Sequence, residues 1–396
     1  MLEVQQDITD TFPYPKYFIE NCLDILEEVN SDNNKYIVGG SNLRIKDFNT
    51  EWGSNNTVIT RNDVCGACAA SERNQGALVL VVDNDEVRVL SSSFTGHIRN
   101  KVCVRKDKNS YYPSMYEAWL RDGKNFLINQ GINPNDPGYS LEKYADPESE
   151  ELSDDLKESL KSIDKEFWNK YKNYEATDFN PSIMVELIHN LFLGQSCNNI
   201  VDFCGGWGNR LFAAYYSRYK SSHNNKAGMY TCVEPSSLLT NLYKGIVEFW
   251  SSEDFENNNL NISVNIIHKA LEDTNDSDIE PNKYDLSFTS PPYFDYEDYA
   301  TSVANLEDIK LQSTSNRTYE EWYHDFLLDL ARKSARALKS GGFFAVYIQN
   351  VITFTDTMKF VKDVSRMEEF TFFDIIGTKK DSNSKKVRTI CVWKRV

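Results

Sequence analysis

Residues 199–219, NIVDFCGGWGNRLFAAYYSRY, contain the stretch that decides the fold. The apolar run 199–203 is typical of a short buried strand, and 211–219 has the spacing of an amphipathic helix. Glycines between them let the backbone turn sharply and approach a ligand closely. The dinucleotide-binding spacing GxGxxG is not met, because Leu211 stands where the third glycine belongs. The stretch predicts a strand, a tight glycine turn and a helix.

Short apolar strands and amphipathic helices alternate from Thr177 onward. Because parallel strands need crossover connections, this alternation predicts an α/β fold with a Rossmann-like, doubly wound parallel sheet. The expected helices are 183–192, 211–219, 236–250 and 319–338, and the expected strands are 199–203, 230–233, 264–268, 286–289 and 343–349.

Composition divides the chain into three parts. Residues 1–145 are expected to form an N-terminal accessory or target-recognition domain of mixed α+β type. In this domain 77–90 has the pattern of two strands joined by a polar turn. Residues 146–176 are acidic and favour a helical linker, and 177–396 are expected to form the catalytic domain.

The charge balance is acidic, with a formal net charge of -16 over 396 residues. Phosphate neutralisation favours basic surfaces, so this charge disfavours nucleic-acid binding unless it is unevenly distributed. The segments 99–108 and 379–388 are locally basic. The sequence has neither an apolar run of the roughly 20 residues that a membrane span needs nor a signal peptide. We therefore expect a soluble intracellular protein, cytoplasmic or associated with the nucleoid or nucleus.

The eight cysteines are scattered and are expected to be reduced thiols. Cys65 and Cys68 have the spacing of metal ligands, but a tetrahedral zinc site needs four ligands and no second CxxC is present. Cys22, Cys103 or His97 would have to complete the site. Ordinary buried thiols are the preferred interpretation, and no metal site is predicted.

Ligands of doubly wound sheets bind at the carboxyl ends of the strands. The glycine turn follows one strand, and Glu234 ends the next. A carboxylate at this place can accept two hydrogen bonds from a ribose diol. The alternative is an acid that favours a helix N-terminus, but its combination with the glycine turn indicates a cofactor site.

A second candidate site follows the strand 286–289, where the sequence is Thr289-Ser290-Pro291-Pro292-Tyr293. Consecutive prolines forbid helix continuation and normal strand pairing, so a rigid loop begins there. Such a loop can present a serine oxygen and a backbone carbonyl to an NH₂ group while an aromatic ring stacks on a flat substrate. An exocyclic amine needs such acceptors because its lone pair is delocalised into the ring, so positioning and electrostatics carry the catalysis. The alternative is a structural proline turn.

Together these motifs resemble the amino-methyltransferases of DNA, which methylate cytosine N4 or adenine N6, over about 177–392. TSPPY matches their catalytic motif, in the form most associated with cytosine N4. The resemblance implies a class I methyltransferase fold, S-adenosyl-L-methionine as cofactor and a nucleic acid as partner, with DNA preferred. It also implies a downstream aromatic, Tyr299, and a set of cofactor-binding residues: Asn180, Pro181, Asp202, Phe203, Cys204, Gly205, Gly206, Gly208, Glu234, Lys269 and Ala270.

The sequence departs from the family pattern at three positions of the cofactor loop. Phe203 and Cys204 replace the usual Pro-Phe pair, and Trp207 is bulky for its place. No long insertion separates the two motifs, so target recognition would fall to the region before Thr177.

Two other classes of function remain open at the level of sequence. RNA, a protein amide of the glutamine type or a small molecule could be the acceptor, since enzymes for these substrates use similar loops. A catalytically silent methyltransferase fold that serves as a binding subunit is the second alternative.

Overall fold

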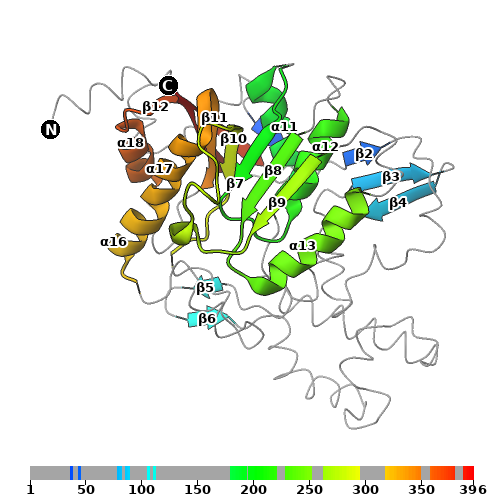
Figure 1. The fold of residues 1–396 in the computed structure, drawn as a ribbon, viewed down its shortest axis with the longest axis horizontal. Helices are drawn as coiled ribbons and strands as arrows, with labels where there is room; N and C mark the ends of the chain where they lie inside the picture. The colour runs from blue at the N-terminus through cyan, green and yellow to red at the C-terminus, as the bar shows by residue number, and fades with distance from the viewer. Residues whose placement is uncertain are drawn as a thin grey trace, which may run out of the picture.

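The computed structural model describes residues 36–38, 43–45, 78–82, 85–89, 105–107, 110–112, 179–193, 195–220, 228–251, 262–294, 317–348, 357–379 and 387–396. Its main feature is an eight-stranded sheet between two layers of helices (Figure 1). Within the described residues no helix has the length and apolarity required to cross a membrane.

The strands of this sheet lie in the order β1-β12-β13-β11-β10-β7-β8-β9. Strands β9, β8, β7, β10 and β11 are mutually parallel, and β13 is antiparallel to both of its neighbours. Their bounds are Tyr36–Val38 (β1), Asn199–Asp202 (β7), Gly228–Val233 (β8), Ile262–Ile267 (β9), Tyr284–Thr289 (β10), Leu338–Ile348 (β11), Phe370–Lys379 (β12) and Val387–Arg395 (β13). The predicted doubly wound α/β fold is confirmed.

The chain reverses the direction in which it adds strands between β7 and β10. From β7 it proceeds outward to β8 and β9, and it then returns to place β10 on the other side of β7. Loops that leave the carboxyl ends of β7 and β10 therefore diverge, which opens a ligand-binding crevice at this point in sheets of this type. Both sequence motifs lie at this switch point.

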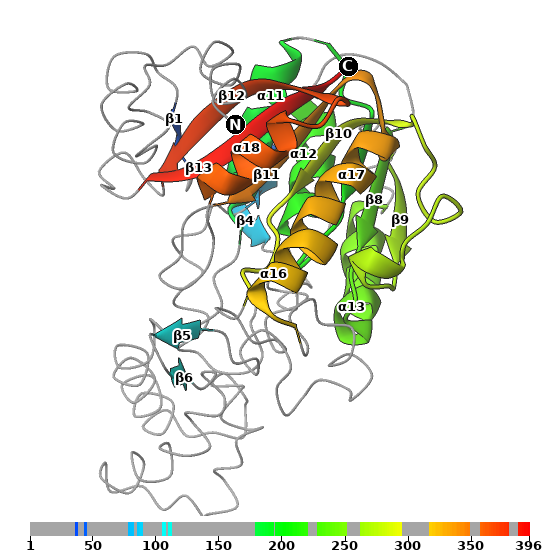
Figure 2. The same ribbon diagram turned by 90° about the vertical axis from the view of Figure 1, so that its left-hand side faces the viewer.

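Helices cover both faces of the sheet (Figures 1 and 2). One layer contains α11 (Pro181–Phe192), α12 (Asn209–Lys220) and α13 (Ser237–Trp250). The other contains α16 (Tyr319–Trp322), the π-helical turn η6 (Tyr323–Leu327), α17 (Leu328–Ala337) and α18 (Thr357–Ser365).

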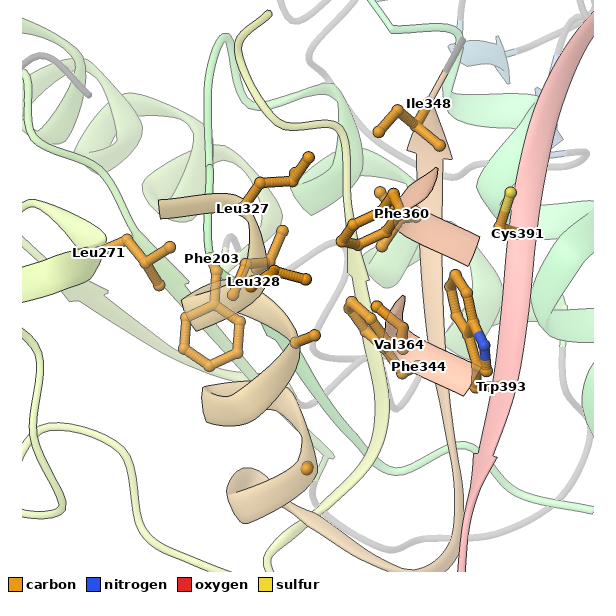
Figure 3. Close-up of a cluster of buried hydrophobic side chains, with 14 of the residues drawn as sticks. Phe203, Leu271, Leu327, Leu328, Phe344, Ile348, Phe360, Val364, Cys391 and Trp393 are labelled. Atoms are coloured by element: carbon orange, nitrogen blue, oxygen red, sulfur yellow. The ribbon is translucent and has the colours of Figure 1, made fainter. Parts of the chain in front are cut away.

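Each face of the sheet has its own apolar core because side chains alternate along a strand. In β7, Val201 contributes to the core under α17 and α18, and Ile200 to the core under α11, α12 and α13. Figure 3 shows part of the first core, where Phe344 of β11 lies beside Trp393 of β13 and the two rings stack at 5.4 Å. Strands β7 and β10 lie in the middle of the sheet order and contribute residues to both cores.

Most predicted elements agree with the structure to within a few residues, with two informative differences. The predicted helix 319–338 contains a π-helical turn, and β11 begins at Leu338 rather than near Phe343. Leu338 pairs with Tyr284, and the register then shifts so that Phe343 pairs with Leu286. The residues between them therefore form a bulge, which periodicity alone does not reveal.

Parts of the N-terminal region are also described. The predicted hairpin within 77–90 is confirmed as β3 (Leu78–Val82) paired antiparallel with β4 (Asp85–Val89), and β2 (Leu43–Ile45) joins β3. A second small sheet pairs β5 (Arg105–Asp107) with β6 (Ser110–Tyr112). Strand β1 pairs with β12 and extends the main sheet, so this early segment contributes to it. The division of the chain at residues 145 and 176 stays a prediction.

Candidate functional site

The glycine turn between β7 and α12 has a backbone that other residues rarely adopt. Gly206 and Gly208 have φ angles of +60° and +87°. A Cβ on Gly208 would lie 2.7 Å from Cδ1 of Ile246, so this position also lacks space for a side chain. Glycine is therefore required at Gly208 for both conformation and packing. The turn brings the backbone of the loop close to α13.

Glu234 follows β8 and is buried, with both carboxylate oxygens facing backbone N–H groups. Oε2 accepts from the Gly206 N–H at 2.8 Å, and Oε1 accepts from the Ser236 N–H at 2.9 Å. Burial raises the pKa of Glu234 to about 7, although these two hydrogen bonds favour the charged form. Each oxygen keeps a second lone pair, so the carboxylate can still accept hydrogen bonds from a diol.

Asp202, at the end of β7, is fully buried and contacts four protein donors. Oδ1 accepts from the Thr289 hydroxyl at 2.8 Å and from the Cys204 N–H at 3.2 Å. Oδ2 accepts from Nε of Arg210 at 2.6 Å and from the Tyr230 hydroxyl at 2.7 Å. Asp202 was predicted to bind the cofactor, but the structure places its carboxylate inside the protein, where it joins the ends of neighbouring strands.

Arg210 of α12 is the main residue that sequence reasoning did not identify. Its guanidinium is buried, pairs with Asp202, and donates through Nη2 to the carbonyls of Cys204 and Gly205. Burial opposes its charge, but Asp202 holds the pKa of Arg210 above its usual value. Arg210 comes two residues after Gly208, so a cation directly following the glycine turn was the available signal.

A second residue outside the sequence prediction, Tyr243, also contacts the glycine turn. The hydroxyl of Tyr243, a buried residue of α13, donates to the Gly206 carbonyl. The Gly205 N–H donates to the Val233 carbonyl at 2.9 Å. Together with the contacts of Arg210 and Glu234, these hydrogen bonds connect the turn to α12, to α13 and to the end of β8.

The other predicted cofactor-binding residues before and within the glycine turn have roles in the fold itself. The Asn180 side chain caps α11 by accepting from the Ser182 N–H at 3.0 Å, and Pro181 begins the helix. Phe203 is buried in the core. Burial and the neighbouring Asp202 raise the pKa of the Cys204 thiol, so this thiol stays protonated near neutral pH.

Lys269 and Ala270 follow β9 at the same edge of the sheet. The Lys269 ammonium pairs with Asp278 at 2.7 Å, and Ala270 precedes the 3₁₀ turn η5 (Leu271–Asp273). The ammonium of Lys333 donates to carbonyls of this turn, including that of Leu271 at 2.8 Å. Lys333 of α17 therefore holds the segment that follows these two predicted cofactor-binding residues.

The proline turn leaves β10 beside the glycine turn. Thr289 is buried, and Ser290 is half-buried with a hydroxyl that makes no hydrogen bond within the described part of the chain. Pro291 is buried and Pro292 half-buried, while the ring of Tyr293 is only 7% exposed and packs within the core under α17. Ser290 is thus the motif side chain with an available polar group.

A half-buried aromatic residue, Phe294, follows the predicted motif. Its ring contacts the rings of Tyr319 and Trp322, each with centroids 5.8 Å away. The capping box between Thr318 and Glu321 begins α16 and positions these two rings. An apolar aromatic wall therefore adjoins the proline turn, and its residue Phe294 lies just outside the predicted motif.

Other predicted features lie outside the described residues. They are Tyr299, the acidic segment 146–176 and the cysteine pair Cys65 and Cys68. Among the residues that the structure does describe, no group of three or more His, Cys, Asp or Glu side chains could hold a metal ion.

No protein-family model matches this chain, and no curated protein matches it. Similar solved structures include an rRNA methylase from Streptococcus thermophilus, 11% identical over 56% of this chain and 99% of that chain, with a TM-score of 0.34. They also include a magnesium protoporphyrin IX methyltransferase with bound SAM from Synechocystis PCC 6803. It is 10% identical over 63% of this chain and 100% of that chain, with a TM-score of 0.34. A 1,6-didemethyltoxoflavin-N1-methyltransferase from Burkholderia thailandensis is 10% identical over 74% of this chain and 95% of that chain, with a TM-score of 0.32. These TM-scores are too low to assign the chain to a family, whereas the strand order by itself defines the doubly wound sheet.

Proposed function

We propose that this chain is an S-adenosylmethionine-dependent methyltransferase that methylates an exocyclic amino group of a nucleic-acid base, with DNA cytosine N4 preferred over adenine N6. One observation carries the proposal. The glycine turn and the serine-proline turn lie at the tips of adjacent parallel strands, and the 2.8 Å hydrogen bond from Thr289 to Asp202 joins them. A cofactor held at the first turn is therefore next to an amine held at the second.

The residues at the glycine turn suit an adenosyl cofactor. Glu234 has free lone pairs for a ribose diol, and Gly206 carries no side chain that would block close approach. S-adenosylmethionine supplies a methyl group that its sulfonium activates for transfer to a nucleophile. The half-buried Ser290 hydroxyl can accept an N–H of the amine, which orients the nitrogen for in-line attack. With this cofactor bound, a C–N bond would form at the expense of the cofactor's C–S bond, and the amine would lose a proton to solvent.

The chemical class of the methyl acceptor is inferred from the chemistry of the proline turn rather than from surface charge. Two prolines make the turn rigid, and a flat heteroaromatic amine fits paired oxygen acceptors beside an aromatic wall. The alternative acceptors are an RNA base, a protein amide and a small molecule. A silent binding subunit would not need a Ser290 hydroxyl that makes no hydrogen bond to any residue the structure describes.

The test compares wild type with Ser290→Ala and with Ser287→Ala. Ser287 is a buried serine of β10, the strand that leads into the proline turn. It contacts Ser334 at 2.8 Å and lies outside both turns. Label from S-adenosylmethionine is offered in parallel to DNA, RNA and protein extract, and nucleosides from DNA of expressing cells are measured by mass spectrometry. We expect labelled DNA with wild type and Ser287→Ala and a loss of about a hundredfold or more with Ser290→Ala. Label confined to RNA or protein would reassign the acceptor, and full activity of Ser290→Ala would refute the role of this hydroxyl.

A further inference from the structure

We propose that Thr289 and Asp202 are positioning residues that couple the two turns, so that occupation of the cofactor site orders the turn that receives the acceptor. This inference rests on the proposed cofactor, but not on the identity of the acceptor. It changes the expected roles of both residues, since neither side chain has a polar group left facing a ligand.

The coupling depends on one shared atom. Oδ1 of Asp202 accepts hydrogen bonds from the Thr289 hydroxyl, which leads into the proline turn, and from the Cys204 N–H, which belongs to the glycine turn. Asp202 and Thr289 are both fully buried, so water does not compete for these hydrogen bonds. A shift of the glycine turn therefore changes the position of the acceptor that holds Thr289.

The opposite side of the carboxylate prevents it from rotating independently. Oδ2 is held by Arg210 and by the Tyr230 hydroxyl, at 2.6 and 2.7 Å. Arg210 also donates to two carbonyls of the glycine turn, so the turn and the carboxylate form one hydrogen-bonded unit. A ligand that fixes the glycine turn also fixes the carboxylate.

The turn beyond Thr289 can transmit this constraint because it is stiff. Ser290 is the next residue, and Pro291 and Pro292 follow with fixed φ angles. Restricting Thr289 therefore restricts the Ser290 hydroxyl, which is the group proposed to receive the amine.

The test is hydrogen exchange of the full-length chain with and without S-adenosylhomocysteine, together with calorimetric titration of the same ligand. The relevant amides are those of 204–209 in the glycine turn and of Ser290, Tyr293 and Phe294 in the proline turn, because proline has no N–H. The variants are Thr289→Val, which removes the hydroxyl at nearly constant shape, Thr289→Ser, which restores it, and Ser287→Ala as the buried control on the same strand.

In wild type, Thr289→Ser and Ser287→Ala, we expect the ligand to slow exchange in both turns, on the order of tenfold. In Thr289→Val we expect protection of the glycine turn alone, with the dissociation constant changed by no more than about threefold. Tyr230→Phe removes a donor from the other oxygen and is expected to keep the protection of both turns. If Thr289→Val fails to fold, Thr289→Ala takes its place in the same exchange measurement. Its protection pattern is then compared with those of wild type and Tyr230→Phe.

Four results would overturn the inference. Protection of the proline turn in Thr289→Val equal to that in wild type would show that the hydroxyl is not the link. If Ser287→Ala lost the protection of the proline turn to the same extent as Thr289→Val, the loss would be a general effect of weakening β10. Binding that protects only the glycine turn in wild type would refute the coupling alone, whereas absence of binding heat would refute the proposed cofactor as well.

Discussion

Oε2 of Glu234 accepts a hydrogen bond of 2.8 Å from the Gly206 N–H, so the acid at the tip of β8 holds the turn at the tip of β7. The proposed ribose acceptor is thus already hydrogen-bonded to the loop that receives the cofactor. Cofactor binding and loop geometry are coupled to the ionisation of one buried carboxyl group.

Affinity for S-adenosylhomocysteine is expected to fall as pH decreases from 8 to 6. The pKa of Glu234 is about 7 because burial disfavours the charge, and hydroxyl donors of a bound ribose favour the charged form. Below pH 7 the free protein must lose a proton to bind well, so the dissociation constant should rise about tenfold at pH 6. Calorimetry across this range measures the change.

Glu234→Gln serves as the control, because an amide does not titrate in this range. It should bind more weakly than wild type at pH 8 and show little further loss at pH 6. A wild-type affinity that stays constant from pH 6 to 8 would contradict the link to Glu234.

Gly208→Ala is expected to lower the free energy of unfolding by about 1–3 kcal/mol and to abolish measurable cofactor binding. The added Cβ meets Ile246 at 2.7 Å on a backbone with φ of +87°. Urea unfolding and titration with S-adenosylhomocysteine provide the measurements.

Gly341→Ala is the matched control for backbone strain. Its φ of +82° is similar, but the nearest atom to its Cβ, on Lys394, is 4.0 Å away, and the residue lies in the bulge of β11. Gly341→Ala should lose about 1 kcal/mol of unfolding free energy and bind S-adenosylhomocysteine normally. Adding Ile246→Val to Gly208→Ala should restore part of the stability, and an unchanged double variant would argue against the clash.

Arg210→Leu is expected to cost about 3–5 kcal/mol of unfolding free energy, because it leaves the carboxylate of Asp202 buried without its cation. Arg210→Lys should be intermediate, since an ammonium cannot reach Asp202 and two carbonyls with the geometry of a guanidinium. Chemical denaturation checks the order of the two variants.

The control for this ion pair is Arg336→Gln. Arg336 pairs with Asp276 at the surface, where their side chains are 64% and 46% exposed, so its loss should cost no more than about 1 kcal/mol. Equal costs for Arg210→Leu and Arg336→Gln would show that burial of the first pair does not govern its contribution.

By itself, the sequence was enough to predict the doubly wound sheet, the glycine turn and the rigid proline turn. These features depend on contiguous residues, since periodicity and turn chemistry are local properties. The bulge in β11 and the pairing of β1 with β12 were not predictable, because both depend on strands that are distant in the chain.

The tertiary structure alone decided which groups of the site face the protein and which remain available. Thr289 and Tyr230 contact Asp202 across sequence separations of 87 and 28 residues, and no local pattern encodes such a meeting. A carboxylate at a strand end has the same sequence signal whether it faces a ligand or internal donors. Burial and the positions of neighbouring strands decide between these outcomes, and they placed Asp202 inside the protein and left the Ser290 hydroxyl without a partner in the described residues.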